Sequence, residues 1–187
     1  MSAPSSPGLT FRIARQADAP YLVELIERAY RGPETAGSWA SEAHLLKGPR
    51  TSLSEVSTLI AREDSRFLVA EAGGKIVACC LLQGLSRPDL DEASVNAAYF
   101  GMFALDPGVQ GGGLGKQVIA EAERRIQDLW GANEMVMTVI NLRTDLIGWY
   151  ERRGYHLTGA TLPFPFSETS GETTRNFHLV EMRKRVA

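Results

Sequence analysis

The chain has 187 residues, of which 44% are hydrophobic and 22% are charged, and its formal net charge is −2. This length and composition predict one globular domain over residues 10–187, preceded by a small, polar and mobile tail over residues 1–9. The near-neutral charge gives no reason to expect nucleic acid or an anionic membrane as a partner. Because the sequence has neither a signal-peptide pattern nor an apolar run of the ~20 residues that span a bilayer, we expect a cytoplasmic protein.

The first half of the chain predicts a strand, two helices and a hairpin. Asp18 is a candidate N-cap for the first helix, and Ser52, with Glu55 three residues later, forms a capping box that starts the second. The dipeptide Gly73-Gly74 is a strong signal for a hairpin turn between two strands. The expected elements are a strand over 10–15, helices over 18–30 and 52–62, and strands over 66–72 and 75–84.

The second half of the chain alternates strands with helices. Apolar runs bounded by turn residues predict the strands, and apolar residues at helical spacing predict the helices between them. The expected elements are strands over 96–105, 134–140 and 175–183, a strand that starts over 155–159, and helices over 115–130 and 144–153. The resulting order, β-α-α-β-β-β-α-β-α-β-β, predicts an α/β fold in which a mixed, largely antiparallel sheet is flanked by helices.

Two adjacent cysteines, Cys79 and Cys80, lie in the second strand of the hairpin. Successive side chains of a strand point to opposite faces, so these two thiols are not expected to pair with each other. Neither has neighbours at metal-ligand spacing, so no metal site is expected. We interpret both as core thiols in a reducing compartment.

A glycine-rich turn, residues 110–116, follows the strand over 96–105 and leads into a helix. Glycines let backbone N–H groups approach a ligand closely, and the unpaired first amides of a helix favour a phosphate or pyrophosphate. A Walker loop is not matched, because Gln110 replaces its first glycine and Gln117 its Ser or Thr. A dinucleotide-binding loop is not matched either, because Lys116 replaces its last glycine. A turn that merely connects a strand to a helix is the alternative at this point.

The same turn fits a third pattern. The motif Q-x-x-G-x-G, beginning at Gln110 and preceded by Asp-Pro at 106–107, resembles the signature with which GNAT acetyltransferases hold the pyrophosphate of acetyl-CoA. The segment from Asn141 to Tyr155 resembles the next motif of that family, in which an Asn after a strand leads into a helix ending Y-E-[RK]-x-G-[FY]. Together with the order of elements, the resemblance covers nearly the whole chain after residue 9. Segments at 30–51 and 155–165 look like a bacterial branch of the superfamily that has no assured substrate.

The resemblance implies a role for individual residues. Backbone groups of the central strand would bind the pantetheine arm of acetyl-CoA like an added strand, and those residues are Phe103, Ala104 and Leu105. The residues that would hold the pyrophosphate are Gln110, Gly111, Gly112, Gly113, Leu114, Gly115 and Lys116. Asn141 would hydrogen-bond the cofactor, and Tyr150 would protonate the departing CoA thiolate, as a phenol with a pKa near ~10 can do. The alternative for Tyr150 is a packed aromatic side chain at the end of its helix.

The implied activity is acetyl transfer to a primary amine by direct attack of the neutral amine on the thioester. Many relatives supply a carboxylate base from the central strand, whereas residues 99–105 contain none. The remaining candidates for the base are Glu24, Glu27, Glu92, His178 and water. A further departure is Arg143, which stands in a segment where the family commonly has an Ala, and we expect it to alter helix packing and not cofactor binding.

The acceptor is not specified by the sequence. We expect a small-molecule amine, and an amine of a protein or peptide is the alternative. A non-catalytic module that binds or senses acyl-CoA is an alternative from another class, favoured by the missing strand carboxylate and opposed by Tyr150. The resemblance leaves the oligomeric state open: dimers are frequent in this superfamily, and the last strands are candidates for pairing across an interface of a homodimer.

Overall fold

The structure is a computed structural model that describes residues 8–32, 48–85, 96–109, 112–164 and 177–186. Its elements occur in the predicted order, β-α-α-β-β-β-α-β-α-β-β, with two short 3-10 turns added. The elements are β1 (Thr10–Ile13), η1 (Gln16–Asp18), α1 (Ala19–Arg31), α2 (Leu53–Ala61), β2 (Ser65–Ala72), β3 (Lys75–Leu85), β4 (Ala97–Leu105), η3 (Pro107–Val109), α3 (Leu114–Trp130), β5 (Glu134–Ile140), α4 (Thr144–Glu151), β6 (His156–Pro163) and β7 (His178–Arg185). The proposed boundary after residue 9 stays a prediction, since residues 1–7 lie outside the described ranges.

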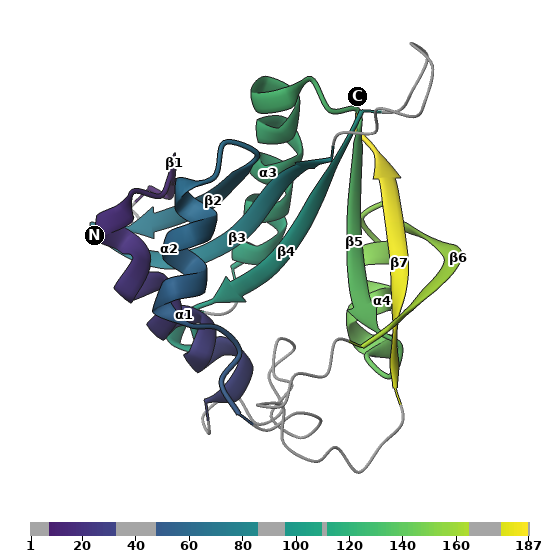
Figure 1. The fold of residues 1–187 in the computed structure, drawn as a ribbon, viewed down its shortest axis with the longest axis horizontal. Coiled ribbons are helices and arrows are strands. Elements are labelled where there is room, and N and C mark those ends of the chain that lie inside the picture. Colours follow the sequence, from purple (N-terminus) through teal and green to yellow (C-terminus); the bar gives the residue numbers. More distant parts are fainter. Residues whose placement is uncertain (1–7, 33–47, 86–95, 110–111, 165–176, 187) are drawn as a thin grey trace, which may run out of the picture.

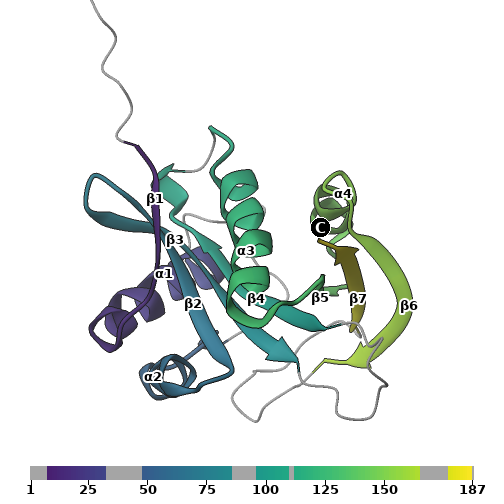
Figure 2. The ribbon, with the colours of Figure 1, turned by 90° about the horizontal axis from the view of Figure 1, so that it is seen from above.

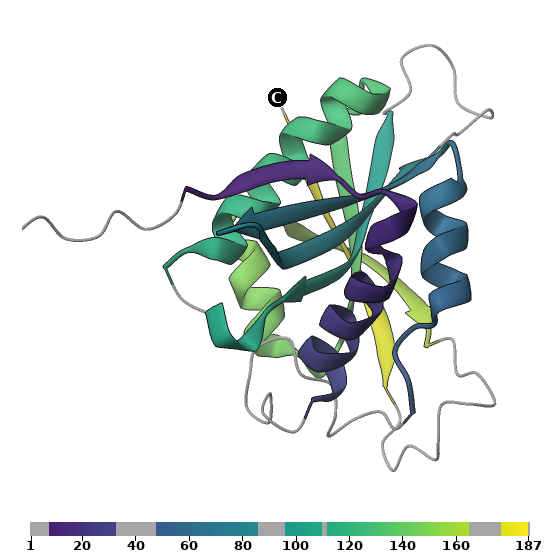
Figure 3. The same ribbon diagram turned by 90° about the vertical axis from the view of Figure 1, so that its left-hand side faces the viewer.

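The seven strands form one mixed sheet in the order β1-β2-β3-β4-β5-β7-β6. Every neighbouring pair is antiparallel except β4 and β5, which run parallel, so the predicted fold class is confirmed. Helices α1 and α2 cover one face of the first four strands, whereas α3 and α4 lie on the opposite face (Figure 2). Strand β1 forms one outer edge of the sheet (Figure 3). No helix in the described part of the chain combines the length and the apolar character that crossing a membrane requires.

Strands β4 and β5 pair only at their beginnings. The register joins Ala97 to Glu134, Ala98 to Met135 and Tyr99 to Val136, and no later pair follows along these two fully described strands. Beyond Tyr99 the two strands diverge, which Figure 1 shows as a widening gap in the middle of the sheet. A parallel sheet that separates in this way leaves backbone groups of each strand directed into the gap.

A bulge in β4 lies beside this gap. The register between β3 and β4 shifts between Cys79 and Leu81, and Met102 opposite has a φ of 44°. A non-glycine residue with positive φ costs about 1–2 kcal/mol, so the surrounding structure must hold it there. The extra residue reverses which side chains of β4 face α3. Before the bulge Phe100 faces α3, whereas after it Phe103 and Leu105 do so.

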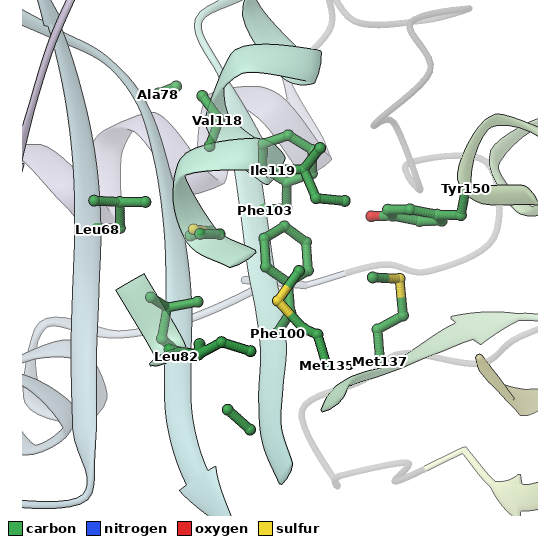
Figure 4. Close-up of a cluster of buried hydrophobic side chains, with 14 of the residues drawn as sticks. Leu68, Ala78, Leu82, Phe100, Phe103, Val118, Ile119, Met135, Met137 and Tyr150 are labelled. Carbon is green, nitrogen blue, oxygen red and sulfur yellow. The ribbon is translucent and has the colours of Figure 1, made fainter. Parts of the chain in front are cut away.

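The core has one large cluster on each face of the sheet, and a small third cluster contains Ile140 and Phe177. On the α3 face the cluster includes Phe100, Phe103, Ile119, Met135 and Tyr150, which Figure 4 shows together. On the α1 face, the buried stripe of α1 packs on side chains of β2, β3 and β4. Both Cys79 and Cys80 are fully buried and unbridged, and they belong to opposite clusters, as the alternation of the strand predicts.

Of the two predicted N-caps, only Ser52 makes the expected side-chain hydrogen bond to its helix. Asp18 is the N-cap of α1, but its side chain does not bond to the helix. Instead its carboxylate accepts the N–H of Arg15 at 2.7 Å and pairs with Arg12 at 2.7 Å. At α2, Ser52 accepts the N–H of Glu55 at 3.1 Å as expected.

The strand predicted to start over 155–159 is β6, which begins at His156. Strand β6 continues to Pro163, because Gly159, with φ +86°, lies in an irregular stretch of its pairing with β7 and does not end the strand. Strand β7 begins at His178 and continues to Arg185, two residues beyond the prediction. The predicted start at 175 lies outside the described residues.

Candidate active site

The edge of β4 that faces the gap presents the backbone groups of Phe103 and Leu105. The N–H of Asp106 donates to the carbonyl of Val77 on β3 at 2.8 Å, so the backbone of Asp106 points toward β3. Because successive residues of a strand point in opposite directions, Ala104 also points toward β3, and Phe103 and Leu105 point into the gap. The Phe103 carbonyl accepts the hydroxyl of Tyr30 from α1 at 3.0 Å, which agrees with that direction. Of the three residues expected to bind pantetheine, two are therefore oriented for it.

The start of α3 lies at the end of the same strand. Gly112 and Gly113 have φ values of +59° and +78°, and a Cβ added at either would meet nothing within 4 Å. The first backbone bond into the helix runs from Gln117 to the carbonyl of Gly113 at 3.1 Å, so the amides of the first turn have no partner within the helix. These amides belong to Leu114, Gly115 and Lys116, as the phosphate interpretation requires, whereas Gln110 and Gly111 lie outside the described residues.

Asp106 holds the connection between β4 and α3 in place. Its carboxylate accepts the N–H of Gly108 at 2.8 Å and pairs with Arg28 of α1 at 2.9 Å. The chain therefore leaves β4 in a short turn that is tied to the opposite layer of the fold. This bonding explains physically why Asp-Pro stands before the glycines.

Tyr150 projects from α4 toward β4. Its side chain is almost fully buried, and its hydroxyl points toward Phe103 and Ile119 (Figure 4). Burial raises the pKa of Tyr150 well above its usual range, and charge on the nearby Tyr30 and other ionisable groups adds to this effect. The phenol therefore stays protonated at neutral pH. No hydrogen bond of this hydroxyl is found among the described residues.

Asn141 lies at the end of β5, where the resemblance expects it. Its side-chain oxygen accepts the N–H of His178 at 3.0 Å, and its own N–H donates to the His178 carbonyl at 2.9 Å. Asn141 thus joins the end of β5 to the start of β7. Its role toward a cofactor stays a prediction, and the side-chain nitrogen is the part of the amide available for it.

The described candidates for the general base come from two elements, α1 and β7. Glu24 is exposed on α1, and His178 is exposed at the start of β7. The Glu27 carboxylate accepts the backbone N–H groups of Arg50 and Thr51 at 2.6 and 2.8 Å, so it holds the chain before α2. Glu92 lies outside the described residues. No group of three or more metal-ligating side chains is found in the described ranges.

Several residues at the gap were not selected from the sequence. The hydroxyl of Tyr99 lies 3.2 Å from Oγ1 of Thr138 on β5, and Tyr30 reaches the gap from α1. Arg143, which the sequence had marked as a departure from the family pattern, lies at the start of α4, is 5% exposed and pairs with Asp145 at 3.0 Å. An aromatic residue at the paired end of the central strand was the available signal for Tyr99, but Thr138 follows only from the register of β5.

Comparison with known proteins adds an independent line of evidence. Residues 22–155 match the model of the acetyltransferase (GNAT) family. No curated protein matches the chain.

Three solved structures show how far the likeness of fold extends. A ribosomal-protein-alanine N-acetyltransferase from Brucella melitensis is 19% identical, with a TM-score of 0.66 over 94% of this chain and 99% of that one. A spermidine N-acetyltransferase chimera from Vibrio cholerae SpeG and hSSAT is 16% identical, with a TM-score of 0.65 over 95% of each chain. The yncA structure from Salmonella typhimurium, with its cofactor acetyl-CoA, is 17% identical, with a TM-score of 0.63 over 96% of this chain and 95% of that one.

At these identities the structures establish the shared fold, and the family model establishes the relationship in sequence. The gap between β4 and β5, the glycine start of α3 and the buried Tyr150 lie where the two family motifs had been identified. The chain therefore belongs to the GNAT family of acetyltransferases, whose acyl donor is acetyl-CoA.

Proposed function

We propose that the protein transfers the acetyl group of acetyl-CoA to a primary amine of a small molecule by direct attack. The observation that carries this proposal is the position of Tyr150, whose hydroxyl points toward Phe103 on the edge of β4 that faces the gap. A proton donor at that place suits a reaction in which a thiolate departs. A module that only binds acyl-CoA has no need of it.

In this proposal, separate groups of the site bind the cofactor, stabilise the oxyanion and protonate the leaving thiolate. The cofactor supplies a thioester, whose pantetheine arm would pair with the β4 edge and whose pyrophosphate would rest on the first-turn amides of Leu114, Gly115 and Lys116. Backbone N–H groups directed into the gap would stabilise negative charge on the carbonyl oxygen. Tyr150 would give its proton to the sulfur as the C–N bond forms and the C–S bond breaks. The extra proton of the amine would leave through water or one of the base candidates.

Replacement of Tyr150 with Phe tests the proposal directly. The variant keeps the ring in its buried packing and removes only the donor, so we expect turnover to fall about 10²-fold or more while the Kd for CoA stays within about twofold. Turnover is read from thiol release, and the Kd from calorimetry. A Tyr21→Phe variant, in which a 65% exposed tyrosine is changed, is the matched control. Unchanged turnover in the Tyr150 variant would refute its role as the acid, whereas measurable CoA binding by the wild type with no turnover on any amine would favour the binding module.

The class of the acceptor needs a separate experiment. The structural relatives include an enzyme named for spermidine and one named for the alanine of a ribosomal protein, so the shared fold accommodates both small amines and protein amines. We propose the small-molecule class, and a panel of polyamines, amino acids and peptides with free N-termini, assayed by thiol release, tests it. Turnover confined to the peptides would replace the small-molecule proposal with the protein one.

We also propose that the protein forms a homodimer through β6. All eight residues of this edge strand are exposed, including Leu157 and Leu162, and the strand carries no Lys, Arg, Asp or Glu. Natural edge strands commonly use charge to prevent pairing with other chains, so an uncharged edge favours a second copy. Light scattering should give twice the chain mass, and Leu162→Lys should give the monomer. Leu53→Lys, on the exposed side of α2, is the control, and a monomeric wild-type protein would overturn the proposal.

A cytoplasmic location is a further proposal that the thiols support. Cys79 and Cys80 are buried and unbridged, as expected for a chain that folds in a reducing compartment. Fractionation of cells that produce the full chain tests it, and recovery from an extracytoplasmic fraction would contradict it.

A further inference from the structure

Arg153 follows α4 and holds an incompletely paired guanidinium. Its carbon Cζ lies 3.4 Å from the ring centroid of Trp149, and Nη1 donates to the carbonyl of Trp149 at 2.6 Å. Its Nε is enclosed and has no hydrogen-bond partner, a condition shared by only one other side-chain atom of the described residues, Ser65 Oγ. None of the ion pairs found across the described ranges includes Arg153. A positive charge fixed on an indole ring without an acidic partner suits an anionic ligand.

The same indole ring lies against the start of α3. A Cβ added at Gly115 would meet Cζ2 of Trp149 at 3.3 Å, and the Trp149 ring also packs on Phe103, with centroids 6.2 Å apart. Gly115 supplies one of the first-turn amides assigned above to the pyrophosphate. Trp149 thus contacts the start of α3 with one edge while Arg153 stacks on its face, so the guanidinium lies about one aromatic ring from the pyrophosphate position.

No ion pair found among the described residues neutralises the positive charge of Arg153. Arg152 is exposed and adds a second positive charge next to it. Glu123, a half-buried carboxylate on α3, accepts the hydroxyl of Tyr155 and the ammonium of Lys184. An anion that approaches the side of α3 near Trp149 would therefore meet the guanidinium of Arg153, which pairs with no acidic side chain among the described residues.

We propose that Arg153, positioned by Trp149, binds the 3′-phosphate of coenzyme A. This inference rests on the proposed use of acetyl-CoA. The pyrophosphate is matched to the amides at the start of α3, and the ribose places the 3′-phosphate one sugar away from it, beyond the reach of those amides. A phosphate monoester carries close to two negative charges at neutral pH, and a guanidinium can bind it with two parallel N–H donors. The residue would thereby distinguish coenzyme A from its 3′-dephospho form.

The test compares two ligands and three proteins by calorimetry. For the wild type we expect CoA to bind about tenfold or more tightly than 3′-dephospho-CoA, the size of effect typical of one charge-assisted contact. Arg153→Gln should weaken CoA binding about tenfold and leave dephospho-CoA binding unchanged, so that the two affinities become similar. Arg152→Gln removes the same charge from the adjacent exposed residue and should preserve the wild-type ratio.

The possible outcomes separate this inference from the proposed function. Equal loss of affinity for both ligands in Arg153→Gln would overturn the assignment, because the residue would then act through Trp149 or on the pyrophosphate. An unchanged ratio in a folded Arg153→Gln variant would overturn it as well. Arg153→Lys keeps the charge without the planar stack, and if the glutamine variant fails to fold, the lysine variant must retain part of the preference for CoA. Absence of CoA binding to the wild type would refute the proposed function itself.

Discussion

The hydroxyl of Tyr99 lies 3.2 Å from the hydroxyl of Thr138, across the line where β4 and β5 cease to pair. Tyr99 belongs to the last backbone pair of the two strands, and Thr138 lies two residues beyond its partner Val136. This contact therefore joins the strands just where the gap begins. It spans the narrow end of the gap.

Gly101 gives the first test of that contact. A Cβ at this position would lie 2.6 Å from Cε1 of Tyr99, closer than atoms can approach, so Gly101→Ala must move the tyrosine ring. We expect the loss of about 1 kcal/mol of unfolding free energy for the broken hydrogen bond, measured by urea denaturation. In a double-mutant cycle, Thr138→Val should cost less in the Gly101→Ala background than alone. Additive losses would show that the contact does not carry the effect.

Gly113 tests the start of α3. Its φ of +78° is unfavourable for any residue with a Cβ, although a Cβ there would meet nothing within 4 Å. Gly113→Ala should therefore cost about 1 kcal/mol through backbone strain alone, and it should weaken CoA binding by misaligning the first-turn amides. Urea denaturation of the variant and the wild type measures the loss of stability, and calorimetry measures the loss of CoA affinity. Gly8→Ala, at a position with open space and no positive φ, is the control and should change neither.

The order of elements and the glycine start of α3 were predictable because both depend on local signals. Periodicity places helices and strands, and glycine marks a turn or a close approach wherever it occurs. The bulge at Met102 was not predictable, because no local preference favours methionine at positive φ and only pairing with β3 holds it there. The end of strand β6 was not predictable either, since Gly159 marks an irregularity inside the strand and not its end.

The residues of the site were likewise predictable where they lie in local motifs, and not where tertiary packing brings them together. Tyr150 and Asn141 were identified because they belong to contiguous motifs. Tyr99, Thr138 and Tyr30 come from three separate elements, and their meeting depends on the register of β5 and on the packing of α1 over β4. Ala104 was expected at the pantetheine edge, and only the bond of Asp106 to β3 shows that its backbone points the other way.

Glu123 connects α3 to the last strand. Its carboxylate accepts the hydroxyl of Tyr155 at 2.9 Å and the ammonium of Lys184 at 2.7 Å, and Tyr155 is almost fully buried. Glu123→Ala would leave a buried hydroxyl unpaired, so we expect a loss of about 2–3 kcal/mol in urea denaturation. Glu121→Ala removes a carboxylate that bonds only to arginines of the same helix and should cost less than about 1 kcal/mol. Equal losses would refute the special role of Glu123.

Stability should fall in acid partly through Asp18. Hydrogen bonds from Arg12 lower the pKa of Asp18 in the folded protein. Below about pH 4, where an unfolded aspartate binds a proton, the unfolded chain then holds more protons than the folded one, so stability is lost as the pH falls toward the folded pKa. Urea denaturation between about pH 7 and pH 3 should show this loss, and Asp18→Asn should reduce its slope. Asp64→Asn, at an exposed pair with Arg62, should alter the slope less, and an identical slope in the Asp18 variant would contradict the prediction.

The two cysteines should be inert toward thiol reagents until the protein unfolds. Both are fully buried, and burial raises the pKa of Cys79 to about 12, so almost no reactive thiolate exists near pH 8. A chromogenic disulfide should report no thiol in the native protein and both thiols in concentrated guanidinium chloride. Rapid reaction of either cysteine in native buffer would show that the sheet opens around β3. Because the protein thiols are not expected to react, thiol release in the acetyl-transfer assay should measure coenzyme A alone.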